Sequence, residues 1–235
     1  MPFAQTGIAF FEEFVFNEVL LASGGLPLYQ QFIRDHDGAA IDSPEFVAAT
    51  EAYARLRGYT DPGMPGRNWT DTANLVINGD AGFILNGDWA NAAFTSAGLV
   101  AGTDYECNIG FASHVMVMGS DALVFPTSGD AELMQAQDLL AATAISLEGQ
   151  INFNSVKGSV PVRTDVDTSA LNSCLAKAVA FVGTEGGATP WPSYYNSPER
   201  NLAVRDLITG FWNTPSMTAE QFRAQLKSTN AQYPN

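Results

Sequence analysis

The chain has 235 residues, of which 46% are hydrophobic and 15% charged, so it can bury a sizeable core and is not of disordered composition. Its formal net charge of -14, from 25 acidic and 11 basic residues, excludes a nonspecific grip on nucleic acid, because that requires clustered lysine and arginine. The same charge opposes binding to anionic membrane surfaces, and no run of about 18 uninterrupted apolar residues is present.

The first part of the chain predicts a helix with a dense phenylalanine content. Apolar residues recur at helical spacing from Ile8 to Leu21, and Ser23-Gly24-Gly25 provides a C-terminal stop. Glu12 and Glu13 are interpreted as a solvated face of this helix. As a catalytic pair they are rejected, because adjacent helical residues point about 100° apart and cannot flank one glycosidic bond.

The next elements are predicted from capping and turn residues. Asp42-Ser43-Pro44 begins a second helix, which runs to Gly58, and the proline- and glycine-rich stretch TDPGMPGRNW is a loop. A short helix follows from Thr70 to Asn78-Gly79, and Ala81 to Leu85 is a short strand.

The middle of the chain has a different pattern. Two apolar segments, 115–118 and 122–125, flank Gly-Ser-Asp and predict a strand, a turn and a second strand. Helices are predicted over 133–145 and from Gln150 to Lys157-Gly158, before an extended Val160-Pro161-Val162.

The last third is predicted to be helical. Helices span 170–182 and 199–211, and a final one begins at Ser216 or Thr218, where Thr218-Ala219-Glu220-Gln221 has the form of a capping box.

The sequence offers little for catalysis or metal binding. His36 and His114 have no second ligand at a recognised spacing, and no nucleophile elbow, phosphate loop or zinc-protease motif occurs. We therefore expect no cofactor, no metal and no enzyme activity. The two cysteines, Cys107 and Cys174, form either one long-loop disulfide or two inert core thiols, since spacing alone does not show that they meet.

Aromatic and amide side chains gather in predicted loops. They are Trp69, Trp89, Trp191, Tyr194, Tyr195, Asn86, Asn91 and Asn196. Such a set suits a sugar, whose C–H face stacks on a ring while its hydroxyls need planar donors and acceptors. The alternative interpretation of each ring is ordinary core packing.

A series of motifs resembles a known family. In order they are DSPEF (42–46), YTDPG (59–63), WTDTA (69–73), INGDAGFILNGDW (77–89), GTDYEC (102–107), SDALVFP (120–126), SLEGQINFNSVKGSVPVRTDVD (146–167) and FWNTPSMTAEQF (211–222). Their order resembles the C-terminal two-thirds of a family 1 extracellular solute-binding protein of a sugar ABC transporter, nearest to the glucose or general monosaccharide binders. GDW and KGSVPVR are the most specific.

The resemblance implies a helix-rich α/β fold of the periplasmic-binding-protein type (type II), in which two lobes close on ligand like a hinge. Residues 1–108 would begin the C-terminal lobe, 109–160 would return to an incomplete N-terminal lobe, and 161–235 would be the closing helices of the C-terminal lobe. The first third of such a protein, with its signal peptide, would be missing, and the first residues here do not resemble a signal peptide. The incomplete lobe would expose apolar edges that invite a homodimer or domain swap.

The resemblance also implies a binding site. Trp89 of GDW would stack on the sugar ring, Asp121 would accept from a hydroxyl, and Lys157 of KGS would donate to one. Tyr194 falls near a position where glucose binders often carry histidine. Asp88 is expected to cap the following helix. Cys107 and Cys174 match cysteines of some glucose-type members, which favours a disulfide.

The function implied is that of a periplasmic receptor, which delivers a sugar to the permease of an ABC transporter, and for this fragment weak binding or none is expected. A carbohydrate-active enzyme or a lectin-like sugar-binding module is the alternative. The resemblance names neither the sugar nor the permease.

Overall fold

The computed structural model describes residues 1–110 and 113–234, which form two compact units. Unit 1 comprises Met1–Asn86, Asn108–Met118 and Thr184–Asn235; unit 2 comprises Gly87–Cys107 and Gly119–Gly183. Residues 111 and 112, which belong to the predicted segment 109–160, and residue 235 lie outside the described residues. The units reflect contacts within this chain alone, so the lobe boundaries at 108 and 160 stay a prediction.

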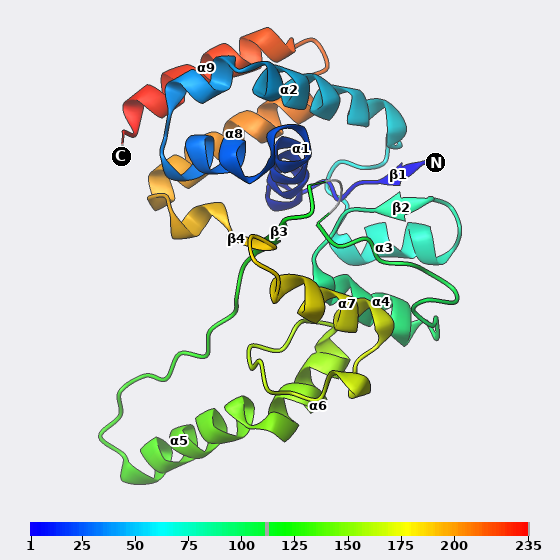
Figure 1. Cartoon of the computed structure of the whole chain (residues 1–235), viewed down its shortest axis with the longest axis vertical. Coiled ribbons are helices and arrows are strands. Elements are labelled where there is room, and N and C mark those ends of the chain that lie inside the picture. The colour runs from blue at the N-terminus through cyan, green and yellow to red at the C-terminus, as the bar shows by residue number, and fades with distance from the viewer. Residues whose placement is uncertain (111–112, 235) are drawn as a thin grey trace. The chain divides into compact units, whose positions relative to one another are not determined.

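Unit 1 is built mainly from α-helices. They are α1 (Ala9–Tyr29), α2 (Pro44–Leu56), α3 (Trp69–Ile77), α8 (Pro198–Asn213) and α9 (Ala219–Gln232). Helix α1 packs against α2 and α8, and α9 packs against α8 and α2 (Figure 1). Aromatic rings fill the contacts: the ring centroids of Phe16 and Tyr53 lie 5.3 Å apart, and those of Phe211 and Phe222 lie 4.4 Å apart. Aromatic side chains therefore make up much of the core of unit 1.

Helix α1 runs past its predicted stop. Gly25 has a φ of 65°, so the helix is interrupted there, but helical structure resumes to Tyr29 and continues as a π-helix over Gln30–Arg34. The residues beyond the interruption that bury their side chains include Leu28, Tyr29, Phe32 and Ile33. Glycine therefore produces a kink rather than an end, because tertiary burial stabilises the second helical piece.

The interpretation of Glu12 and Glu13 as a solvated face is wrong. Each residue is only 2% exposed. An oxygen of Glu13 lies 2.6 Å from Nε of Arg205, and Nδ2 of Asn213 donates to Glu12 at 3.0 Å. Both partners belong to α8 and lie about 190 to 200 residues after the two glutamates in the chain. Burial raises the pKa of both carboxyls, and these contacts oppose the rise.

The strands are short and parallel. Strand β1 (Phe3–Ala4) pairs with β2 (Phe83–Ile84), and β3 (Met116–Met118) pairs with β4 (Ala188–Pro190). The predicted second strand at 122–125 is wrong, since these residues are exposed and have no strand partner among the described residues. The predicted hairpin does not form, because β3 pairs with a strand about 70 residues away. Strand β1 was not predicted, because its two residues are too few to show a pattern.

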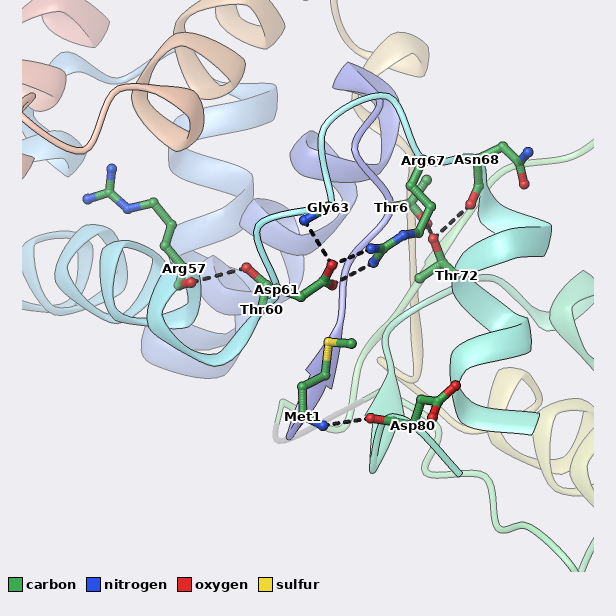
Figure 2. A network of polar contacts seen from close by, with 10 residues as sticks. All are labelled: Met1, Thr6, Arg57, Thr60, Asp61, Gly63, Arg67, Asn68, Thr72 and Asp80. Atoms are coloured by element: carbon green, nitrogen blue, oxygen red, sulfur yellow. Dashed lines mark hydrogen bonds and ion pairs between the residues drawn. The ribbon is translucent and has the colours of Figure 1, made fainter. Parts of the chain in front are cut away.

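The loop between α2 and α3 is held by polar contacts (Figure 2). Asp61 forms a two-bond ion pair with Arg67 and accepts from the backbone N–H of Gly63 at 2.9 Å. The hydroxyl of Thr6 donates to that of Thr72 at 3.0 Å, which ties the start of the chain to α3. The loop predicted from proline and glycine is thus confirmed. Backbone hydrogen bonds that join Gly7 to Gly66 and Arg67 hold it together with these side chains.

Two predicted N-terminal caps are confirmed. Ser43 accepts from the N–H of Phe46 at the start of α2, and Thr218 and Gln221 form the capping box of α9. The remaining short helices of unit 1 span Gly38–Asp42, Arg57–Tyr59 and Pro192–Tyr194. Among the described residues, no helix combines the length and hydropathy needed to cross a bilayer.

Unit 2 is smaller, and α5 (Ala131–Ile145) is the longest of its described helices. The others are a 3-10 turn (Asp88–Ala90), α4 (Asn91–Ser96), α6 (Leu147–Lys157), a second 3-10 turn (Thr168–Ala170) and α7 (Ser173–Val182). A disulfide joins Cys107 to Cys174, with Cα atoms 5.5 Å apart, so the disulfide alternative is confirmed. The predicted helices α5 and α6 are confirmed too, and α6 ends as expected at a left-handed Gly158.

Candidate ligand-binding site

The Gly87-Asp88-Trp89 turn opens unit 2 and positions an indole. A Cβ at Gly87 would lie 2.1 Å from a ring carbon of Trp89, so the indole rests directly on the Gly87 α-carbon. Trp89 as a whole is half-buried. Only glycine at position 87 permits this arrangement, and the ring is therefore held by backbone rather than by a flexible neighbour.

Asp88 does not cap the following helix. The turn begins at Gly87 without a side-chain cap, and Oδ2 of Asp88 accepts from the backbone N–H of Val160 at 2.7 Å. Burial raises the pKa of the Asp88 carboxyl, and the Val160 N–H together with the charge of Lys157 opposes that rise. The expectation of a cap is thus corrected, because a long-range backbone donor takes the carboxylate.

Lys157 lies in the last turn of α6 and pairs with Asp121. Its Nζ is 2.5 Å from Oδ2 of Asp121, and it lies 5.9 Å from the centre of the Phe153 ring. The side chain of Asp121 is 87% exposed and that of Lys157 is 34% exposed, so the pair contributes little to stability. Both charged groups are available to solvent at the end of a helix.

The predicted site residues therefore divide between the two units. Trp89, Asp121 and Lys157 belong to unit 2, where the charge of Lys157 acts on Asp88 beside Trp89. Tyr194 belongs to unit 1, at the end of the short helix Pro192–Tyr194, and is 58% exposed.

Some of the other aromatic and amide residues have structural roles. Trp191 is buried, with its ring 5.0 Å from that of Phe10 and 5.7 Å from that of Phe14. Nδ2 of Asn91 donates to the carbonyl of Asp88 at 2.9 Å, and its Oδ1 accepts from the hydroxyl of Tyr105 at 3.1 Å. Core packing is thus the correct interpretation of Trp191, and the Asn91 amide braces the Asp88 turn.

Ser159, which follows Lys157-Gly158, was not predicted as a site residue. It is 6% exposed, and its hydroxyl has no hydrogen-bond partner among the described residues. The serine of the KGS motif was the available signal, since a small hydroxyl beside a lysine is a plain donor and acceptor.

The chemistry available is recognition of a polar ligand. The set offers an aromatic ring, a carboxylate acceptor and an ammonium donor, which together match a ring with hydroxyl groups. In the described part of the chain, no group of three or more histidine, cysteine or acidic residues is placed to hold a metal ion.

Comparison with protein families gives a match over most of the chain. Residues 4–181 match the family described as bacterial extracellular solute-binding protein. The chain belongs to this family. Relatives of this solute-binding protein include probable sugar-binding periplasmic proteins of Mesorhizobium japonicum, 31% identical over 96% of the chain, and of Brucella suis, 32% identical over 98%. Because these matches cover 55% and 53% of the relatives, the chain spans about half of their length.

Solved structures with the same fold agree. A chitin oligosaccharide binding protein superposes with a TM-score of 0.75 at 17% identity, covering 99% of this chain and 59% of that one. The bacterial solute receptor AcbH, described as having an exclusive preference for β-D-galactopyranose, superposes with a TM-score of 0.72 at 18% identity, covering 98% of this chain and 59% of that one. The predicted helix-rich α/β fold of the periplasmic-binding-protein type is confirmed.

Proposed function

We propose that this solute-binding chain acts as the sugar-binding component of an ABC transporter and binds a monosaccharide. The names of its relatives support a carbohydrate ligand and a periplasmic location, and one relative from Haloferax volcanii, 28% identical over 74% of this chain, is named a xylose/arabinose-binding protein. In this proposal the chain passes the sugar to a transporter permease, which carries it into the cytoplasm.

The observation that carries the proposal is the grouping in unit 2. Trp89 presents an indole supported by Gly87, while Lys157 and Asp121 hold an exposed charge pair. A sugar hydroxyl can accept from Lys157 and donate to Asp121, and the C–H face of the ring can stack on the indole. Tyr194 belongs to unit 1 and is not part of this grouping, so its contact with a sugar stays a prediction from the resemblance.

Binding without turnover is part of the proposal. Relatives of the family are solute-binding proteins, and the proposed contacts need no activated nucleophile or tuned acid. The test is a titration of this chain with glucose, galactose, xylose and arabinose, followed by chemical shifts so that weak complexes are detected. Hydrolysis of glycosides is assayed in parallel. Saturable shifts without product support the receptor, whereas turnover of a glycoside supports the alternative enzyme.

Replacing Trp89 should weaken sugar binding. We expect Trp89→Ala to cost about 1 to 3 kcal/mol of binding free energy, the scale for loss of a stacked aromatic anchor. The measurement is the change in dissociation constant for the best sugar of the panel. Trp69→Ala is the matched control, because Trp69 is also half-buried but begins α3 in unit 1. Equal losses in both variants would remove Trp89 from the site.

A homodimer is the proposed state of this chain in solution. Helix α5 has no buried side chain, and exposed apolar residues precede and line it: Leu123, Val124, Leu133, Leu139, Leu140 and Ile145. A 15-residue helix without packing is marginal in water, so a second copy that covers this face would stabilise it. Native mass spectrometry should give twice the chain mass, and Leu139→Glu with Leu140→Glu should return it to the monomer. A monomeric wild-type chain at micromolar concentration would contradict the dimer.

A further inference from the structure

Two parts of unit 2 that are far apart in the sequence are joined through the side chain of Asp88. The bond from the Val160 N–H to Oδ2 of Asp88, at 2.7 Å, spans 72 residues. Asp88 directly precedes Trp89, and Val160 comes three residues after Lys157. One hydrogen bond therefore connects the turn that carries the indole with the segment that carries the ammonium group.

A second contact joins the same segments. Gly158 has a φ of 80°, and a Cβ at this position would lie 2.6 Å from the backbone N of Ala92. The end of α6 thus lies directly against the start of α4, in a place where only glycine fits. The Asp88–Val160 hydrogen bond and the close approach of Gly158 to Ala92 therefore hold the same two segments together.

The carboxyl of Asp88 is placed for this backbone contact. The charge of Lys157 on α6 favours the ionised form of this carboxyl, and so do the backbone N–H groups of Val160 and Trp89. An asparagine oxygen at the same place would accept the Val160 bond without the charge. A glutamate would keep the charge but would carry it one methylene further from the backbone.

We propose that Asp88 is a positioning residue: by binding the Val160 N–H it fixes the Trp89 indole relative to Lys157, and so sets ligand affinity without touching the ligand. This inference rests on the proposed function, in which Trp89 and Lys157 contact a sugar. It predicts that sugar affinity depends on the position of the Asp88 acceptor oxygen and not on its charge.

The test compares Asp88→Asn with Asp88→Glu in the full chain. Asp88→Asn should keep sugar affinity within about twofold of the wild type, because the acceptor stays in place. Asp88→Glu should weaken affinity by about tenfold, the effect of losing one well-placed hydrogen bond in a site. If Asp88→Asn loses as much affinity as Asp88→Glu, the charge matters and the positioning role is wrong.

A second measurement needs no sugar. Amide hydrogen exchange at Val160 should be slow in the wild type and in Asp88→Asn, and at least about tenfold faster in Asp88→Glu. The indole N–H resonance of Trp89 should move in Asp88→Glu only. Unchanged exchange and an unchanged indole signal in Asp88→Glu would overturn the positioning role even if the chain binds sugar.

The two proposals fail in different ways. If sugar binding does not depend on Trp89 and Lys157, the proposed site is wrong, while amide exchange at Val160 still reports whether Asp88 holds the two segments. If sugar affinity depends on Trp89 and Lys157 but is the same in Asp88→Asn and Asp88→Glu, the proposed function stands and the positioning role is wrong.

Discussion

Removal of the Cys107–Cys174 disulfide should lower the free energy of unfolding of unit 2 by about 4 kcal/mol, because the bond closes a long loop in the unfolded chain. The two cysteines are 67 residues apart, and both belong to unit 2. The bond pins the segment after α4 to α7, where Lys177 and Glu106 also pair at 2.7 Å. Unit 2 has few buried side chains, so this cross-link is a large part of its stability.

The measurement is urea unfolding of the double variant Cys107→Ala/Cys174→Ala against the oxidised wild type. The reduced wild type serves as a second route to the same state, and reductant should have no effect on the double variant. Both routes should agree within about 1 kcal/mol, since each removes the same constraint. A double variant as stable as the oxidised protein would show that local packing, rather than the disulfide, holds this part of unit 2.

Local signals in the sequence predicted most helices well. Ser43 before Pro44, the Thr218 capping box and Gly158 after Lys157 each act within one helical turn, so short stretches of sequence suffice to find them. The errors have a common cause in contacts between distant residues. Strand β3 pairs with β4, and Glu13 pairs with Arg205, and neither partner is visible in the local pattern.

The candidate site shows the same division. The GDW and KGS motifs named Trp89 and Lys157, and the structure adds what the motifs do not contain. Gly87 is required by the indole that rests on it, and Asp88 binds a backbone N–H at Val160 instead of its own helix. Local rules favoured a cap for Asp88, but the long-range donor could be found only after α6 and α4 were placed side by side.

Glu18 on α1 is a buried acid whose cost depends on pH. It is nearly inaccessible to solvent, one carboxyl oxygen has no partner among the described residues, and burial raises its pKa to about 7. The nearby hydroxyl of Tyr29 donates to the Pro190 carbonyl. Burial raises the pKa of Tyr29, and the charges of Glu13, Tyr195 and Glu18 add to that rise. Ionisation of Glu18 therefore places a charge in a poorly solvated interior.

The sign of the pH effect follows from proton binding. Between the ordinary pKa of a glutamate and about 7, the folded protein holds a proton that the unfolded chain releases. The stabilisation from this proton is complete at low pH and is lost as pH rises through the folded value. Relative to Glu18→Gln, the wild type should lose about 2 to 3 kcal/mol of unfolding free energy from about pH 5 to about pH 8.

Urea unfolding of wild type and Glu18→Gln at several pH values measures this difference directly. The variant should match the wild type near pH 5 and exceed its stability near pH 8, because glutamine fills the same space without a charge. Glu51→Gln, at an exposed position of α2, is the control and should change stability by less than about 0.5 kcal/mol throughout. Parallel curves for Glu18→Gln and the wild type would mean that water or a rearranged partner solvates the Glu18 carboxylate, and that its burial carries no cost.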